Sequence, residues 1–158
     1  MNLGSEEGNI SKINGLDIWW NSFGNPEDPS VLMIMGLNSN SKVWSEKFIQ
    51  ELVNNNLHVI IFDNRDIGKS TWVTEEPRLI SFIKILPNFL KEYFVEFIFG
   101  FIFNEEGKFN MENPAPAEYN LSDMANDGVM LLDNMGISEA HIIGASMGGM
   151  IAQVLAST

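Results

Sequence analysis

The sequence predicts an α/β fold built on a mostly parallel sheet, and three observations support this. Short, almost wholly apolar runs at 31–35, 57–62 and 140–143 are typical of strands that are covered on both faces. Stretches with helical spacing of apolar residues lie between and after them. Near the start of the chain, Asn14-Gly15 is a strong signal for a hairpin. Strands alternating with helices favour a parallel sheet with helices on both faces, and the hairpin adds an antiparallel edge.

The first half of the chain is expected to form a hairpin, a strand, a helix and another strand. In order, the elements are strands at 10–13, 16–23 and 31–35, a helix at 44–52 and a strand at 57–62. Trp44, Phe48 and Leu52 share one stripe of the helix. Ser41 is the expected N-cap.

The end of the chain is expected to repeat the pattern of helix, strand and helix. These elements are a helix at 119–135, a strand at 140–143 and a helix at 147–156. Ser122 is a candidate cap for the first helix, and Gly136 stands where a glycine commonly ends one.

The segment at about 74–117 is longer than the usual connection between such elements. Its apolar residues recur at steps of three and four, which predicts an amphipathic helix, or two helices broken near Pro87. Lys91, Glu92 and Glu96 interrupt the apolar run, so no transmembrane span is expected. Three readings stay open: a lid over an active site, plain packing, or a membrane or partner surface. The expected organisation is a partial core domain over 1–158 with a helical, lid-like insertion.

Composition excludes several classes of function. The 158 residues contain no cysteine, which rules out disulfides, thiol nucleophiles, iron–sulfur clusters and cysteine-ligated zinc. The formal net charge of −12 argues against binding nucleic acid or anionic membranes. The first residues show no basic or apolar region of a signal peptide, so a cytoplasmic protein is expected. We expect neither a cofactor nor a metal.

Residues 144–148 read Gly-Ala-Ser-Met-Gly and fit the pattern G-x-S-x-G. A buried strand is expected directly before this segment and an apolar helix directly after it, which is the setting that a nucleophile elbow requires. The turn must be tight, so Gly144 and Gly148 leave room for the crossing backbone. The pattern makes Ser146 the candidate nucleophile. The alternative is a glycine-rich turn that only packs a helix on a strand.

A serine that attacks a carbonyl also needs hydrogen-bond donors for the oxyanion. The N–H of Met147, directly after the candidate nucleophile, is one expected donor. The other is expected from the loop after the first parallel strand, where Leu37 N–H is the candidate and Gly36 allows a close approach. The alternative is an ordinary loop from strand to helix.

These motifs resemble the α/β-hydrolase superfamily, in particular esterases similar to aclacinomycin methylesterase. The matching segments are 35–44, 62–71, 119–137 and 141–153. The resemblance implies strand order 1-2-4-3-5 with strand 2 antiparallel, and Ser146 as nucleophile. It also implies a mainly structural loop after strand 4, formed here by Asp63, Arg65, Asp66, Gly68 and Ser70. The sequence departs from the family where Met35 replaces the usual histidine before Gly36, and in the place of the 74–117 segment.

The catalytic base is not expected among the two histidines of the chain. His141 precedes Ser146 by five residues on one strand, or roughly 15 Å. His58 begins its strand, away from the carboxyl edge where such sites form. In the resembled superfamily the acid and the histidine follow the serine. The chain is therefore expected to be truncated after the nucleophile helix and inactive alone. Its fifth strand would be an exposed edge, which favours pairing with a second copy.

The leading hypothesis is a serine hydrolase that acts on a small apolar carboxylic ester. A serine at the elbow disfavours epoxide hydrolase and haloalkane dehalogenase chemistry, while amidase, peptidase, perhydrolase and carbon–carbon hydrolase activities stay open. The alternative is a non-catalytic, truncated hydrolase-like protein that binds an apolar ligand or partner. A flavodoxin-type binding domain ranks last, because no phosphate-binding glycine loop follows the first parallel strand.

Overall fold

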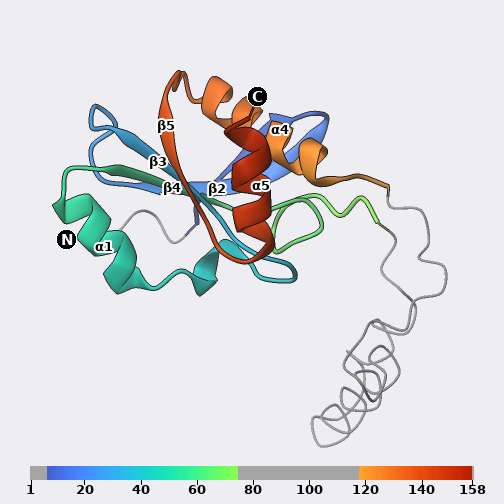
Figure 1. Ribbon diagram of the computed structural model, residues 1–158, viewed down its shortest axis with the longest axis horizontal. Helices are drawn as coiled ribbons and strands as arrows, with labels where there is room; N and C mark the ends of the chain where they lie inside the picture. The colour runs from blue at the N-terminus through green and yellow to red at the C-terminus, as the bar shows by residue number, and fades with distance from the viewer. Residues whose placement is uncertain (1–6, 75–117, 158) are drawn as a thin grey trace, which may run out of the picture. The chain divides into compact units, whose positions relative to one another are not determined.

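The computed structural model describes residues 7–74 and 118–157 (Figure 1). Apart from Thr74, the insertion expected at 74–117 lies outside these residues, and so do the alternatives weighed for it.

The described residues form one mixed sheet of five strands. The strands are β1 (Asn9–Ile13), β2 (Leu16–Phe23), β3 (Ser30–Ile34), β4 (His58–Phe62) and β5 (Ala140–Gly144). Their order in the sheet is β1-β2-β4-β3-β5. β2 runs antiparallel to β1 and β4, whereas β3 runs parallel to β4 and β5. This confirms the predicted strand order and the antiparallel second strand.

Helices cover both faces of the sheet (Figure 1). They are the short 3₁₀ helix η1 (Ser41–Val43), α1 (Glu46–Asn54), α4 (Leu121–Asn134) and α5 (Met147–Leu155). Alternate residues of the central strands enter two cores, so that Leu32 packs with Leu131 and Ile151 of α4 and α5. On the other face Met33 packs with Ile49 of α1. Every residue of β3 and β4 is buried, as their apolar runs predict.

Two predicted helix caps are wrong. α1 begins at Glu46 after Ser45, and Ser41 instead lies at the start of η1, where its hydroxyl donates to Asp63. Nor does Ser122 cap α4, because Asn120 does so. The Asn120 side chain accepts from the backbone of Ser122 and Asp123, and the Asp123 carboxylate accepts from Asn120 N–H. This reciprocal capping box satisfies donors that the helix leaves free. The predicted terminal glycine is confirmed, since Gly136 follows the C-cap residue Met135 and has φ of 73°.

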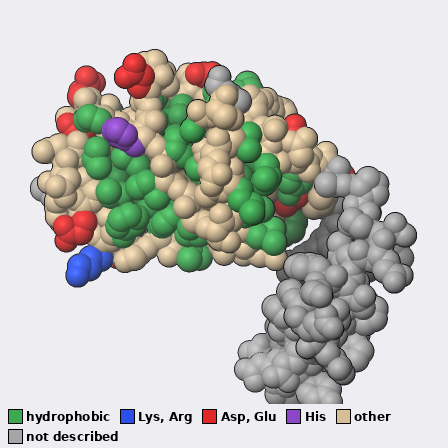
Figure 2. Space-filling model, in the orientation of Figure 1, with side chains coloured by type: hydrophobic (Ala, Val, Ile, Leu, Met, Phe, Trp, Pro, Cys, Tyr) green, Lys and Arg blue, Asp and Glu red, His purple; other side chains and the backbone are tan. Residues whose placement is uncertain are grey.

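The edge of the sheet beside β5 is partly exposed. Within the described ranges β5 pairs with β3 alone, and none of its five residues is fully buried. Figure 2 shows hydrophobic side chains reaching the surface on both sides of α5, on this face of the molecule. Pairing of this edge with a second copy stays a prediction.

Of the helices in the described part of the chain, none combines the length and the apolar character that crossing a membrane requires.

Candidate active site

Ser146 occupies the turn between β5 and α5 in an uncommon backbone conformation. Its φ is 55° and its ψ is −123°, a region that costs a residue with a side chain about 1–3 kcal/mol. The Ser146 side chain forms no capping hydrogen bond with α5, and the residue is exposed. The serine hydroxyl is thus presented at the carboxyl end of β5 and is not used to stabilise the helix.

Two glycines allow the backbone segments around the turn to cross. A Cβ atom on Gly144 would lie 2.2 Å from the carbonyl oxygen of Gly148. A Cβ atom on Gly148 would lie 2.1 Å from the carbonyl oxygen of Ile34, at the end of β3. No side chain fits at such distances. Only glycine fits at Gly144 and Gly148, and their role in a nucleophile elbow stays a prediction.

The loop after β3 lies directly against the candidate nucleophile. Ala145 N–H donates to the carbonyl of Ile34 over 3.0 Å, which holds the turn on the end of β3. A Cβ atom on Gly36 would lie 2.9 Å from Cβ of Ser146 and 3.4 Å from its Oγ. The missing side chain at Gly36 is what allows the loop to come this close.

The two candidate oxyanion donors lie on the segments that flank Ser146. Met147 is the first residue of α5, so its N–H has no acceptor within the helix. Leu37 follows Gly36, and the residue is 66% exposed. Neither backbone N–H donates a hydrogen bond to another residue of the described ranges. Their role in binding an oxyanion stays a prediction.

Both histidines lie at the opposite edge of the sheet. Ser30, the first residue of β3, is in register with His58 and with Ala140, the neighbour of His141. The His58 ring is buried, with Nδ1 3.2 Å from Ser30 Oγ. Burial lowers the pKa of His58, although Asp28 opposes this. Neither ring reaches Ser146, at the carboxyl end of β5.

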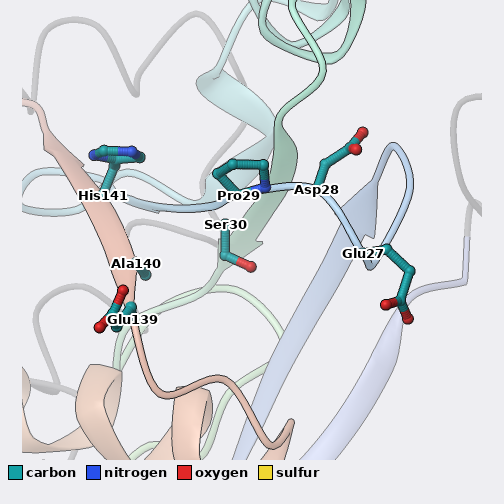
Figure 3. A pocket seen from close by; sticks show the side chains of 7 residues that line it. All are labelled: Glu27, Asp28, Pro29, Ser30, Glu139, Ala140 and His141. Atoms are coloured by element: carbon teal, nitrogen blue, oxygen red, sulfur yellow. The ribbon is translucent and has the colours of Figure 1, made fainter.

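A cavity of about 460 Å³ lies at this amino edge of the sheet (Figure 3). Figure 3 shows Glu139 and His141 on the side of β5 and Glu27 and Asp28 on the other side, with Pro29 and Ser30 between them. The carboxylates point in different directions, and no group of three or more potential ligands in the described ranges could hold a metal ion.

The loop after β4 is a buried hydrogen-bonded structure. One oxygen of the Asp63 carboxylate accepts from both N–H and Oγ–H of Ser41, at 2.8 and 2.7 Å. The other oxygen accepts from Lys69 N–H over 3.1 Å, and Ser70 Oγ donates to the Asp63 carbonyl over 2.6 Å. These contacts tie the loop to η1 and support the structural role that the resemblance implies.

Arg65 in the same loop forms a buried ion pair that the sequence did not indicate. Its Nε and Nη2 each donate to a different oxygen of Asp127 in α4, over 2.8 Å. Asn14 Nδ2 also donates to Asp127 over 2.8 Å, and the guanidinium lies 5.0 Å from the Tyr119 ring centre. The Asp127 hydrogen bond raises the pKa of Arg65. Burial, and then a hydrogen bond with Asp66, raise the pKa of Tyr119 to about 12. This cluster joins the hairpin, the loop and α4.

Comparison with known proteins gives one family match and several relatives. A family model described as alpha/beta hydrolase fold matches residues 29–158. The rhodomycin D methylesterases DnrP of Streptomyces peucetius and DauP of Streptomyces sp. (strain C5) are 26% and 24% identical over 139 residues. Each alignment covers 88% of this chain and 34% of the relative. The chain thus spans about a third of the length of the curated relatives that it matches.

The fold also matches solved structures. Epoxide hydrolase A from Mycobacterium thermoresistibile superposes with a TM-score of 0.64 at 20% sequence identity. The match covers 97% of this chain and 34% of that structure. At this level of identity the likeness concerns the fold alone.

Proposed function

The chain belongs to the α/β-hydrolase fold family, and we propose that it carries the nucleophile, Ser146, of a serine hydrolase that acts on carboxylic esters. The observation that supports this best is the conformation of Ser146. A serine held at φ 55°, exposed and without a capping hydrogen bond, has no apparent structural benefit for the fold. Strain of this kind is typical of a nucleophile elbow, where it presents the hydroxyl to a substrate.

In the proposed reaction, Ser146 Oγ attacks the ester carbonyl carbon while a base takes the hydroxyl proton. The carbonyl oxygen becomes an oxyanion, which accepts hydrogen bonds from Met147 and Leu37 N–H. The intermediate collapses when the alcohol leaves with a proton, and an acyl-serine forms. Water then attacks the acyl-serine and releases the acid and the free serine.

The base and its orienting acid are proposed to come from outside these 158 residues. A base must lie about 3 Å from the proton that it takes, directly or through one water. His58 and His141 lie at the amino edge of the sheet, so neither meets this requirement. In this fold family the acid and the histidine follow the serine along the chain.

The proposed substrate is a small ester with an apolar portion. The two curated relatives are methylesterases by name, which makes a methyl ester the first substrate to test. Leu37, beside Gly36, exposes 66% of its surface, and Met150, one turn after Ser146, exposes 57%. Both side chains are apolar, so contact with an apolar part of the substrate would break no hydrogen bond of theirs. We also propose a cytoplasmic location, as the sequence predicts.

A fluorophosphonate probe, which reacts with activated serines, tests the proposal. The protein expressed from the complete reading frame should be labelled at Ser146 and lose the label in Ser146→Ala. Ser138→Ala is the matched control, since Ser138 is another exposed serine, in the connection before β5. This control should keep the label, and the 158-residue chain alone should be labelled weakly.

Two results would contradict parts of the proposal. Labelling that survives Ser146→Ala would refute the assignment of the nucleophile. Strong labelling of the 158-residue chain at Ser146 would refute the idea that the base lies elsewhere. Complete absence of labelling and of esterase activity would favour the alternative, a non-catalytic protein that binds an apolar ligand or partner. Reading the DNA beyond codon 158 for an acid and a histidine is an independent check.

A further inference from the structure

Asn64 is a buried polar residue in the loop after β4, with no role in the reaction described so far. The residue is 3% exposed, and its Nδ2 donates to the backbone carbonyl of Met35 over 3.0 Å. A carbonyl oxygen can only accept, so the NH₂ group of the amide must face Met35. The amide therefore joins the loop after β4 to the loop after β3.

The carbonyl that Asn64 holds belongs to the peptide between Met35 and Gly36. Leu37 N–H, the proposed oxyanion donor, lies one peptide further along. Gly36 separates the two peptides, and a glycine leaves its backbone dihedrals unusually free. On its other side the Met35 carbonyl is crowded by α5, since a Cβ atom on Gly148 would lie 2.9 Å from it. Asn64 thus holds the peptide group between Met35 and Gly36, directly before the one glycine whose dihedrals set the direction of Leu37 N–H.

The oxygen atom of the same amide supports this reading independently. Asn64 Oδ1 is buried and has no hydrogen-bond partner among the described residues. A buried acceptor without a partner lowers the stability of the folded state. An apolar residue of similar size would avoid that penalty but would leave the Met35 carbonyl without the donor that Asn64 provides. The site thus accepts an unpartnered oxygen in order to keep the donor that holds the Met35 carbonyl.

We propose that Asn64 is a positioning residue, which orients the loop 35–37 so that Leu37 N–H faces the oxyanion formed at Ser146. This inference rests on the function proposed above. Asn64 does not touch the substrate, and it acts through the Met35 carbonyl. Its expected effect is on the transition state. A misdirected N–H weakens the hydrogen bond to the charged oxyanion more than the hydrogen bond to the neutral carbonyl of the bound substrate.

Two substitutions in the protein from the complete reading frame test the inference. Asn64→Leu removes donor and acceptor at similar size, and Asn64→Asp keeps the shape but replaces the donor by an acceptor. Loss of an entire oxyanion donor costs about 10²–10³ in kcat, so misdirecting one is expected to cost about tenfold to a hundredfold. The KM for a methyl or p-nitrophenyl ester should stay within about twofold, as for an interaction made in the transition state.

A trifluoromethyl ketone provides a readout that a purely structural role would not change. It forms a tetrahedral adduct with an active serine and carries the oxyanion, so its affinity should fall by the same factor as kcat/KM. Ser30→Ala is the matched control, because it removes a buried hydrogen bond, to His58, at the opposite end of β3. This control should change stability and leave kcat and inhibitor affinity unchanged.

The outcomes distinguish the inference from the proposed function. If the unaltered protein has Ser146-dependent esterase activity and both Asn64 variants keep kcat within twofold, the positioning role is wrong and the proposed function stands. Equal losses of kcat in Ser30→Ala and Asn64→Leu would show a general structural effect and refute the role as well. If the unaltered protein lacks Ser146-dependent activity, both ideas fail. Should Asn64→Leu not fold, Asn64→Asp, which preserves the shape, decides the question.

Discussion

A single methyl group added at Gly148 tests the central geometric claim about the elbow. The new Cβ atom would lie 2.1 Å from the carbonyl oxygen and 2.7 Å from the carbonyl carbon of Ile34. It would also lie 2.9 Å from the carbonyl oxygen of Met35. All three are backbone atoms of the last residue of β3 and the residue after it, so no side-chain rotation relieves the overlap. Either the start of α5 or the loop after β3 must move.

The expected cost follows from two opposing effects. Overpacking of a closely packed site costs about 1–3 kcal/mol, and the rigid backbone at Gly148 places this case at the upper end. Replacing glycine by alanine inside a helix recovers about 0.5–1 kcal/mol. The net expectation is a loss of about 2 kcal/mol in the free energy of unfolding, which changes the ratio of folded to unfolded protein by a factor of roughly 30.

Urea denaturation followed by circular dichroism measures this loss, with Gly149→Ala as the matched control. A Cβ atom on Gly149 would lie 3.5 Å from the Gly144 carbonyl oxygen, an ordinary contact distance. Gly149→Ala should therefore be as stable as the unaltered protein or slightly more stable. Gly148→Ala should also react more slowly with the fluorophosphonate probe. Equal urea midpoints for the two variants would show that the proposed close crossing of α5 and β3 is wrong.

Three further predictions concern strain, a buried charge and pH. In urea denaturation, Ser146→Gly should be about 1 kcal/mol more stable than Ser146→Ala, because glycine adopts φ 55° without a steric penalty. Equal urea midpoints for the two variants would show that the backbone at residue 146 is not strained. Asp127→Leu leaves the Arg65 charge buried and should cost about 3–5 kcal/mol, whereas Arg65→Met with Asp127→Leu should recover most of it. No recovery in the double variant would contradict the ion-pair argument. Because burial lowers the pKa of His58, the unfolded state binds the proton more readily, and the free energy of unfolding should fall as pH drops below about 6.5. His58→Gln should reduce this pH dependence, as thermal unfolding across pH would show.

The sequence predicted the sheet well because its central strands have no exposed face. After their first residues, Ser30 and His58, β3 and β4 are wholly apolar, and each contributes alternate side chains to two separate cores. Few other structures bury five consecutive residues in this way. The place of Ser146 was predictable for a similar reason, since the glycines that a tight turn needs are next to the serine in the chain.

The helix starts were harder to predict because several residue types cap equally well. Asn120 competes with Ser122 for the start of α4, and the capping box with Asp123 decides in favour of Asn120. Serine is a common N-cap residue, but the hydroxyl of Ser41 donates a hydrogen bond to Asp63, which is 22 residues away in the chain. A local sequence pattern does not reveal a hydrogen-bond partner that comes near only when the sheet has folded.

The same limit explains the polar contacts around the site that the sequence did not reveal. Arg65 and Asp127 are 62 residues apart, and Asn64 and Met35 are 29 apart. Each pair meets because β4 lies beside β3 and because α4 packs over that face of the sheet. Neither pair has a spacing or a periodicity that would mark it in advance.

The position of β3 explains why the candidate site forms where it does. β3 lies between β4 and β5 and is parallel to both, so the loops after all three strands leave the sheet at one edge. Neighbouring strands are about 4.8 Å apart, which places these loops within about 10 Å of one another. The loop after β5 supplies Ser146, the loop after β3 supplies Leu37 N–H, and the loop after β4 supplies Asn64 to hold the β3 loop. Substitutions at the opposite ends of the same strands, such as Ser30→Ala, should therefore alter stability without changing the reactivity of Ser146.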